Sequence, residues 1–111
     1  MQNLVIRIDT NRIKDWNSFH NLFAEVFGFP DFYGRNMDAW IDCMSSLDVE
    51  DGMTQVHVSP GNVVVLQLEN ADGFFTRCPD QYNALIECSA FVNHRRIEIG
   101  LEPVMALSFY K

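Results

Sequence analysis

The sequence lacks any apolar run of the roughly 18 residues that a membrane-spanning helix needs. Its first residues also lack the basic region and the long apolar stretch of a secretory signal peptide. It has no repeats, linkers or low-complexity segments, and its 48% apolar and 21% charged residues match an ordinary folded domain. We therefore expect a single domain over residues 1–111, in a cytoplasmic protein that does not contact membranes.

Cysteine and histidine are also few, three of each, and they are scattered. Cys43, Cys78 and Cys88 show no CxxC spacing, and the histidines lie far from them and from each other in the sequence. A zinc site needs a compact set of such ligands. We expect free thiols, no bound metal and no cofactor.

Basic residues are scarce as well, with 8 lysines and arginines against 15 acidic residues and a formal net charge of −7. Such a charge repels phosphate backbones and anionic lipid surfaces, so nucleic acid is not expected as a direct partner. Segment 31–51 carries six acidic residues against Arg35 alone, a net charge of −5. This cluster indicates either a cationic partner or a solvated surface.

Three short apolar segments predict β-strands, at residues 4–8, 63–68 and 104–109. The second is nearly continuous in apolar residues, which is typical of a central strand covered on both faces in a parallel sheet. Helical patterns lie between the strands. This order predicts an α/β fold in which right-handed crossovers place three strands in a small parallel sheet packed with helices.

Capping residues predict where the helices begin and end. Asp15 can cap a helix that buries an aromatic stripe and ends at Gly28, and Asn36 can cap a second helix that reaches about residue 47. A third helix is expected to begin near Pro79. Its expected buried residues are Tyr82, Leu85, Ile86 and Ser89 to Val92, and Arg95 and Arg96 lie near its negative end.

Two segments between these elements read as loops. Pro30 and Gly34 prevent residues 29–35 from continuing a helix, so we expect a loop with exposed aromatic side chains. Gly34 is expected to take a backbone conformation that other residues resist. Residues 48–62 have a weak pattern and a strong turn signal, which predicts a loop with room for one short strand.

The helix expected at residues 37–47 has one apolar and one acidic face. The apolar face is predicted to hold Met37, Trp40, Ile41, Met44 and Leu47, and the acidic face Asp38, Asp42, Ser45 and Ser46. Asp38 and Asp42 are four residues apart and repel each other, so a cationic group outside the fold would stabilise them. A purely solvated surface explains the same pattern.

An enzymatic interpretation would make Asp38 and Asp42 a general acid and base, or two ligands of a divalent metal. The sequence supports neither chemistry. Two acids on a convex helix have no pocket that would raise the pKa of one of them, and no His, Ser or Lys stands at a spacing that completes a mechanism. We expect a binding protein and not an enzyme.

Residues 29–44 read Phe-Pro-Asp-Phe-Tyr-Gly-Arg-Asn-Met-Asp-Ala-Trp-Ile-Asp-Cys-Met. This segment resembles the motif of the barstar family, the intracellular inhibitors of barnase-type ribonucleases, and the expected order of elements agrees with that family's three-stranded α/β fold. The resemblance implies a monomeric immunity protein whose acidic helix and preceding loop block the active site of a basic ribonuclease. Carboxylates would take the place of the substrate phosphates.

The resemblance also implies roles for single residues. Asp42 matches the central carboxylate that the family's inhibitors place in the ribonuclease active site. Asp38 matches the acid one turn earlier on the same helix. Phe32 matches an aromatic that packs on the ribonuclease, Gly34 a position of backbone contacts, and Glu87 is the candidate for a glutamate on the later helix. The remaining candidate contact residues are Tyr33, Arg35, Asn36 and Ser45. Of these, Asn36 fits a helix cap better than a contact, and Tyr33 could equally pack into the base of the loop.

The chain departs from the family pattern at several positions. Phe32 replaces a tyrosine of the family's best-known member, Arg35 replaces an acid, and Leu47 replaces an aromatic. The segment between Leu47 and Val63 is also longer. Because a like charge facing a basic enzyme lowers affinity, Arg35 indicates a cognate nuclease other than barnase. The alternative interpretation is a barstar-fold binding module for another cationic protein.

Overall fold

A parallel sheet of three strands organises the computed structural model, which describes residues 3–111. The strands are β1 (Leu4–Asp9), β2 (Val64–Glu69) and β3 (Met105–Phe109), in the order β1-β2-β3. Leu4 pairs with Val64, which in turn pairs with Met105. All three predicted strands and the parallel α/β architecture are confirmed.

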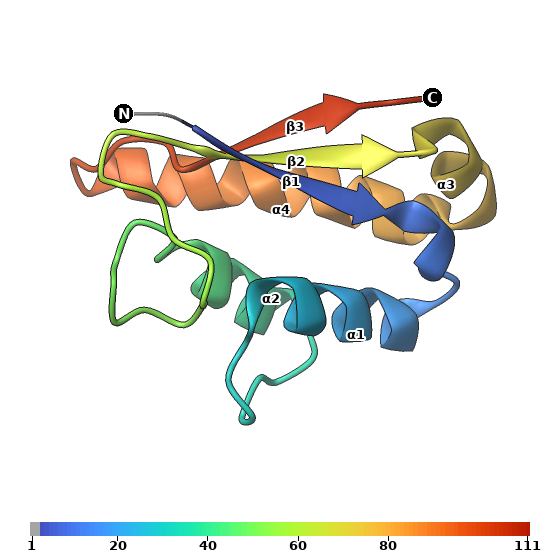
Figure 1. Ribbon diagram of the computed structural model, residues 1–111, viewed down its shortest axis with the longest axis horizontal. Helices are drawn as coiled ribbons and strands as arrows, with labels where there is room; N and C mark the ends of the chain where they lie inside the picture. Colours follow the sequence, from blue (N-terminus) through green and yellow to red (C-terminus); the bar gives the residue numbers. More distant parts are fainter. Residues whose placement is uncertain (1–2) are drawn as a thin grey trace.

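The helices lie along one face of this sheet (Figure 1). They are α1 (Trp16–Phe27), α2 (Met37–Met44), α3 (Ala71–Arg77) and α4 (Pro79–Glu98), with a 3-10 turn η1 (Thr10–Arg12) after β1. Val64, Leu66 and Leu68 of β2 are fully buried, whereas the residues between them are half-buried. The prediction that β2 is covered on both faces is therefore wrong, because alternate β2 side chains point away from the helices.

Helix α1 begins and ends where its capping residues predict. The Asp15 carboxylate accepts a hydrogen bond from the Ser18 backbone N–H at 2.8 Å, and the Ser18 hydroxyl accepts one from the Asp15 N–H at 3.0 Å. Gly28 ends the helix with a φ of 65°. The aromatic stripe, Phe19, Phe23 and Phe27, is fully buried, although Trp16 at the first turn is exposed.

Two parts of the second half of the chain differ from the prediction. Helix α3 forms between β2 and α4, where the capping residues predict no helix, and it buries Ala71 and Phe74 against the core. In α4, Leu85, Ser89 and Val92 are buried as expected, but Ala90 and Phe91 are exposed. Residues 89–92 cannot all face the core, since four consecutive helical residues point in all directions around the axis.

The long segment between α2 and β2 is a loop held by backbone hydrogen bonds. The Gln55 N–H donates to the Phe27 carbonyl at 2.8 Å, and the Val58 N–H donates to the Leu47 carbonyl at 3.0 Å. The short strand for which the sequence left room does not form within residues 48–62. This segment instead packs against the end of α1, where the Gln55 side chain covers Gly28.

Candidate functional site

Helix α2 presents two aspartates on a rigid support. The Asn36 side chain accepts a hydrogen bond from the Ala39 N–H at 2.8 Å, which confirms Asn36 as the N-cap. On the inner face Trp40, Ile41 and Met44 are buried, while Asp38 and Asp42 are exposed on the outer face. The α-helix ends at Met44 instead of near residue 47, but Leu47 in the following turn is still fully buried.

The loop before α2 exposes only one of its three aromatic side chains. Phe32 is 75% exposed, and the loop projects away from the sheet (Figure 1). Phe29 and Tyr33 turn inward, with ring centroids 4.6 Å apart. Tyr33 is buried and therefore occupies the base of the loop, the second of the two positions considered for it. Burial raises the pKa of Tyr33, so its hydroxyl stays protonated.

Tyr33 is fixed by a hydrogen bond to a buried histidine of α1. The Tyr33 hydroxyl oxygen lies 2.6 Å from Nδ1 of His20, which is 4% exposed. Burial, and secondarily the charge of Arg35, lower the pKa of His20. The neutral ring can accept a hydrogen bond from the Tyr33 hydroxyl at Nδ1, whereas the protonated ring can only donate one.

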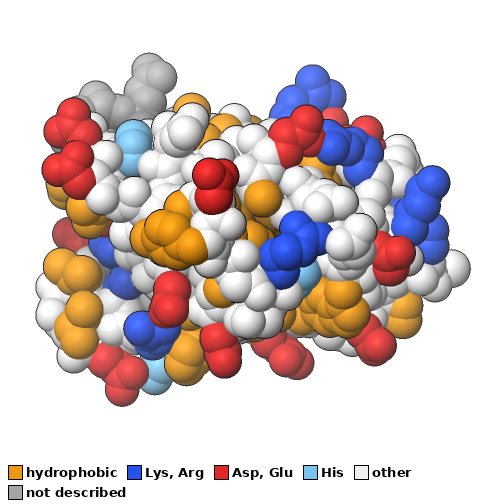
Figure 2. All heavy atoms as spheres, turned by 90° about the horizontal axis from the view of Figure 1, so that it is seen from below, with side chains coloured by type: hydrophobic (Ala, Val, Ile, Leu, Met, Phe, Trp, Pro, Cys, Tyr) orange, Lys and Arg blue, Asp and Glu red, His pale blue; other side chains and the backbone are white. Residues whose placement is uncertain are grey.

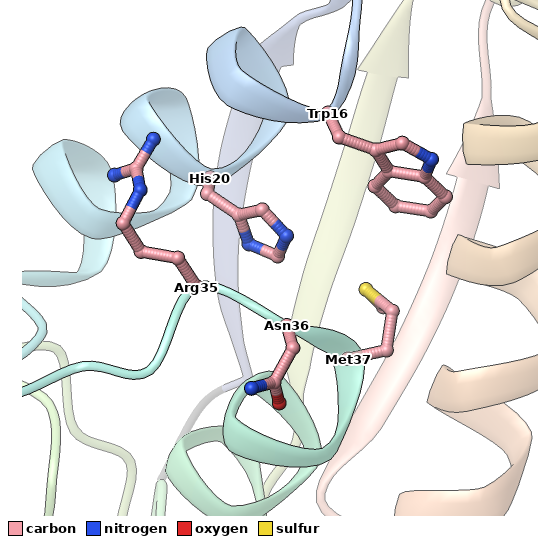
Figure 3. A pocket seen from close by; sticks show the side chains of 5 residues that line it. All are labelled: Trp16, His20, Arg35, Asn36 and Met37. Atoms are coloured by element: carbon pink, nitrogen blue, oxygen red, sulfur yellow. The ribbon is translucent and has the colours of Figure 1, made fainter.

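The backbone conformation expected at Gly34 occurs one residue later. Arg35 has a φ of 56°, in the left-handed region that costs a non-glycine residue about 1 kcal/mol. Its guanidinium donates to the Asn17 carbonyl at 3.0 Å and to the Asn17 side-chain oxygen at 2.7 Å. The positive charge therefore lies against α1, at the edge of a hollow into which His20 points (Figure 3).

Two arginines of α4 are part of the site, and sequence reasoning missed this. Arg95 Nη1 lies 3.4 Å from Asp42 Oδ1, with both side chains largely in solvent. Arg96 is buried and binds Asp48 with two hydrogen bonds, of 3.0 and 2.6 Å. The sequence placed both arginines at the end of a helix, but nothing local indicated which acids they would meet.

The surface formed by segment 31–51 is consequently less negative than the net charge of −5 counted from its sequence. The Asp48 carboxylate is neutralised by Arg96 and its side chain is only 13% exposed, and Asp42 shares its surface with Arg95. Seen from the side opposite the sheet, acidic side chains are separated by hydrophobic and basic ones and do not form one continuous patch (Figure 2). The surface around α2 carries charges of both signs.

Helix α4 carries Glu87, the candidate for the glutamate on the later helix. Glu87 is exposed, and its neighbour Cys88 is half-buried against the hydrophobic core. Burial raises the pKa of the Cys88 thiol, and the carboxylates of Glu87 and Asp38 raise it further. Asp38 of α2 and Glu87 of α4 therefore act on the same thiol, and the two helices that carry them pack against each other.

Ser45 is the C-cap of α2, and its groups are already used within the fold. Its hydroxyl donates to the Ile41 carbonyl at 2.6 Å, and its own carbonyl accepts from Arg96 at 2.8 Å. No cluster of three or more His, Cys, Asp or Glu side chains in residues 3–111 is arranged to hold a metal ion. Over the same residues, no helix is long and apolar enough to cross a membrane.

Comparison with known proteins adds one match. The model of a family described as Barstar (barnase inhibitor) matches residues 3–102 of the chain. That match covers most of the 111 residues, including the loop, α2 and the whole of α4. None of the curated proteins matches the chain.

Proposed function

The chain belongs to the barstar family of barnase inhibitors, and from this premise we propose that it blocks the active site of a ribonuclease with the acidic face of α2 and the loop before it. Family membership carries the general function, inhibition of barnase-type ribonucleases. The proposal concerns the surface that this chain uses. The chain acts, in this proposal, as a single domain and a monomer in the cytoplasm. It catalyses no reaction and does not contact nucleic acid directly.

The observation that carries the proposal is the exposure of Asp38 and Asp42 on a helix whose other face is buried. A ribonuclease presents cationic side chains to a phosphodiester, and carboxylates held at fixed positions can bind them with charge-assisted hydrogen bonds. Because α2 is capped by Asn36 and anchored by Trp40, the two acids lose little conformational freedom on binding. The net charge of −7 favours fast association with a basic enzyme.

The other candidate residues complete this surface. Phe32 supplies exposed apolar area on the loop before α2, and Gly34 follows two residues later on the same loop. Glu87 adds a third carboxylate from α4. Tyr33 and Asn36 act indirectly, since both hold the loop in place. Arg35 and Ser45 border the surface, and their side chains bind to α1 and α2 respectively.

A second candidate function is a barstar-fold module for another cationic protein. Arg35 favours this candidate, because it places a positive charge at the edge of the proposed surface. Both functions use the same acidic face, and they differ only in the class of partner. Ribonuclease assays therefore separate them.

Inhibition assays with Asp42→Ala test the proposed surface. We expect the wild type to inhibit at least one of a panel of barnase-type and toxin-derived ribonucleases stoichiometrically, as measured by hydrolysis of a fluorogenic RNA. Asp42→Ala should weaken that inhibition about 30-fold or more, as at a central interface residue. Its free energy of unfolding should change by less than about 0.5 kcal/mol, because the side chain is exposed.

Glu25→Ala is the matched control for Asp42→Ala. Glu25 also lies on a helix, pairs with an arginine (Arg12) and has a side-chain exposure of 63%, against 66% for Asp42. It lies outside the proposed surface, so inhibition should stay at the wild-type level. Equal inhibition by Asp42→Ala and Glu25→Ala would contradict the assignment of the site. No inhibition by the wild type across the panel would favour the module for another cationic protein.

A further inference from the structure

A positive charge stands inside the proposed contact surface. Arg95 of α4 places its Nη1 atom 3.4 Å from Asp42 Oδ1, and the two side chains are 46% and 66% exposed. The guanidinium carbon also lies 5.9 Å from the ring centroid of Phe91, one turn earlier on α4. Arg95 therefore lies beside Asp42, the residue proposed above as the central contact with the ribonuclease.

This ion pair differs in kind from its neighbour on α4. Arg96 is buried, binds Asp48 through two nitrogens, and donates to the backbone carbonyls of Ser45 and Glu102. Arg95 makes a single contact with Asp42, at a longer distance and in solvent. Exposed pairs of this geometry contribute little to the stability of a fold. Arg95 therefore affects the binding of partner groups to Asp42 more than it affects the stability of the fold.

The two ends of the contact between α2 and α4 differ in charge as a result. At one end, Asp38 on α2 and Glu87 on α4 are exposed carboxylates, and both raise the pKa of the Cys88 thiol. Toward the end of α4, Asp42 and Arg95 form a pair of opposite charges. A partner that offers only cations meets attraction at the first end. At the second end it must either displace Arg95 or bring its own cation close to it, and both lower its affinity.

We propose that Arg95 is a specificity-determining residue of this surface, an inference that rests on the ribonuclease inhibition proposed above. It weakens binding to ribonucleases that place a cation opposite it. It favours a ribonuclease that places a carboxylate beside its cationic groups, so that the carboxylate binds Arg95 while the cations bind Asp38 and Asp42. The partner is thus defined by a carboxylate that lies opposite Arg95 in the complex.

The test compares inhibition constants of the wild type, Arg95→Gln, Arg95→Lys and Arg7→Gln across barnase and other barnase-type ribonucleases. Arg7→Gln is the matched control, because it removes the same charge from an exposed ion pair, with Glu69, on the face of the sheet away from the helices. Arg95→Lys keeps the charge, and it should keep the wild-type order of inhibition.

Arg95→Gln is expected to tighten inhibition of the weakly inhibited ribonucleases by about three- to tenfold and to weaken inhibition of the best-inhibited one. Equal changes for every ribonuclease, as for Arg7→Gln, would overturn the inference, while the loss of inhibition in Asp42→Ala would still support the proposed function. If the wild type inhibits none and Arg95→Gln inhibits one, the inference stands, because the arginine prevented binding. If neither inhibits any, both proposals fail.

Discussion

Single residues of the same type have different roles within the acidic segment. Asp42 and Asp48 both face an arginine of α4, but only Asp42 remains in solvent and available to a partner. The sequence around each aspartate does not indicate which of the two stays exposed. Their roles follow from depth of burial, which depends on how α4 packs against the end of α2.

The buried His20 predicts a pH dependence of stability. Its pKa is lowered in the folded state, by burial first and by Arg35 second, from the 6.5 of the unfolded chain. As the pH falls below about 6.5, the unfolded chain binds a proton that the folded state resists, so the free energy of unfolding decreases until the pH reaches the lowered pKa. Urea denaturation between about pH 7.5 and 5.5 measures this decrease.

The control for this pH prediction is His20→Asn, which keeps an acceptor near the Tyr33 hydroxyl but cannot titrate. It should show a flatter dependence over the same range. The carboxyls of Asp15 and Glu69 do not interfere, since their pKa values are lowered from 3.8 and 4.5 and their contributions are lost only at lower pH. Identical slopes for both proteins would show that His20 is not the titrating group.

At the scale of elements, the ion pair between Asp48 and the buried Arg96 joins the loop after α2 to α4. Asp48→Ala leaves the Arg96 charge buried without its partner, so we expect the free energy of unfolding to fall by about 3 kcal/mol or more. Chemical denaturation measures the loss. Asp42→Ala, which breaks the exposed pair, should be nearly neutral in the same experiment.

A double variant separates the charge from the packing at this junction. Asp48→Leu combined with Arg96→Met removes both charges, and it should destabilise the protein less than Asp48→Ala alone, because no unpaired charge remains buried. Two outcomes would argue against a structural role for the pair: an Asp48→Ala variant as stable as Asp42→Ala, or a double variant that loses the most.

Helix ends could be predicted from the sequence where capping residues next to them determine the structure. The ends of α1 and the start of α2 follow from Asp15, Gly28 and Asn36, whose side chains or backbone satisfy the groups next to them. Helix α3 was missed because Gly73 lowers its intrinsic propensity, and its formation depends on the burial of Phe74. The exposure of Phe91 was missed because a short apolar run does not reveal which side of α4 faces the sheet.

On the scale of the whole molecule, the charge of −7 predicts that association with a basic ribonuclease depends on salt. Raising the ionic strength to about 0.5 M screens long-range attraction, so the association rate should fall steeply while the dissociation rate changes much less. Stopped-flow measurements with an inhibited ribonuclease determine both rates. Phe32→Ala should instead raise the dissociation rate and keep the salt dependence. An association rate that is independent of salt would contradict an electrostatic surface.

The sequence by itself determined the strands, the first two helices, the family motif and the positions of Asp38 and Asp42 on one helix face, because periodicity and capping act between near neighbours. Only the tertiary structure decided that the helices cover one face of the sheet, that Tyr33 binds His20, and that Arg95 and Arg96 meet acids 53 and 48 residues away. Such contacts depend on how elements far apart in the chain pack together, and no local pattern specifies that packing.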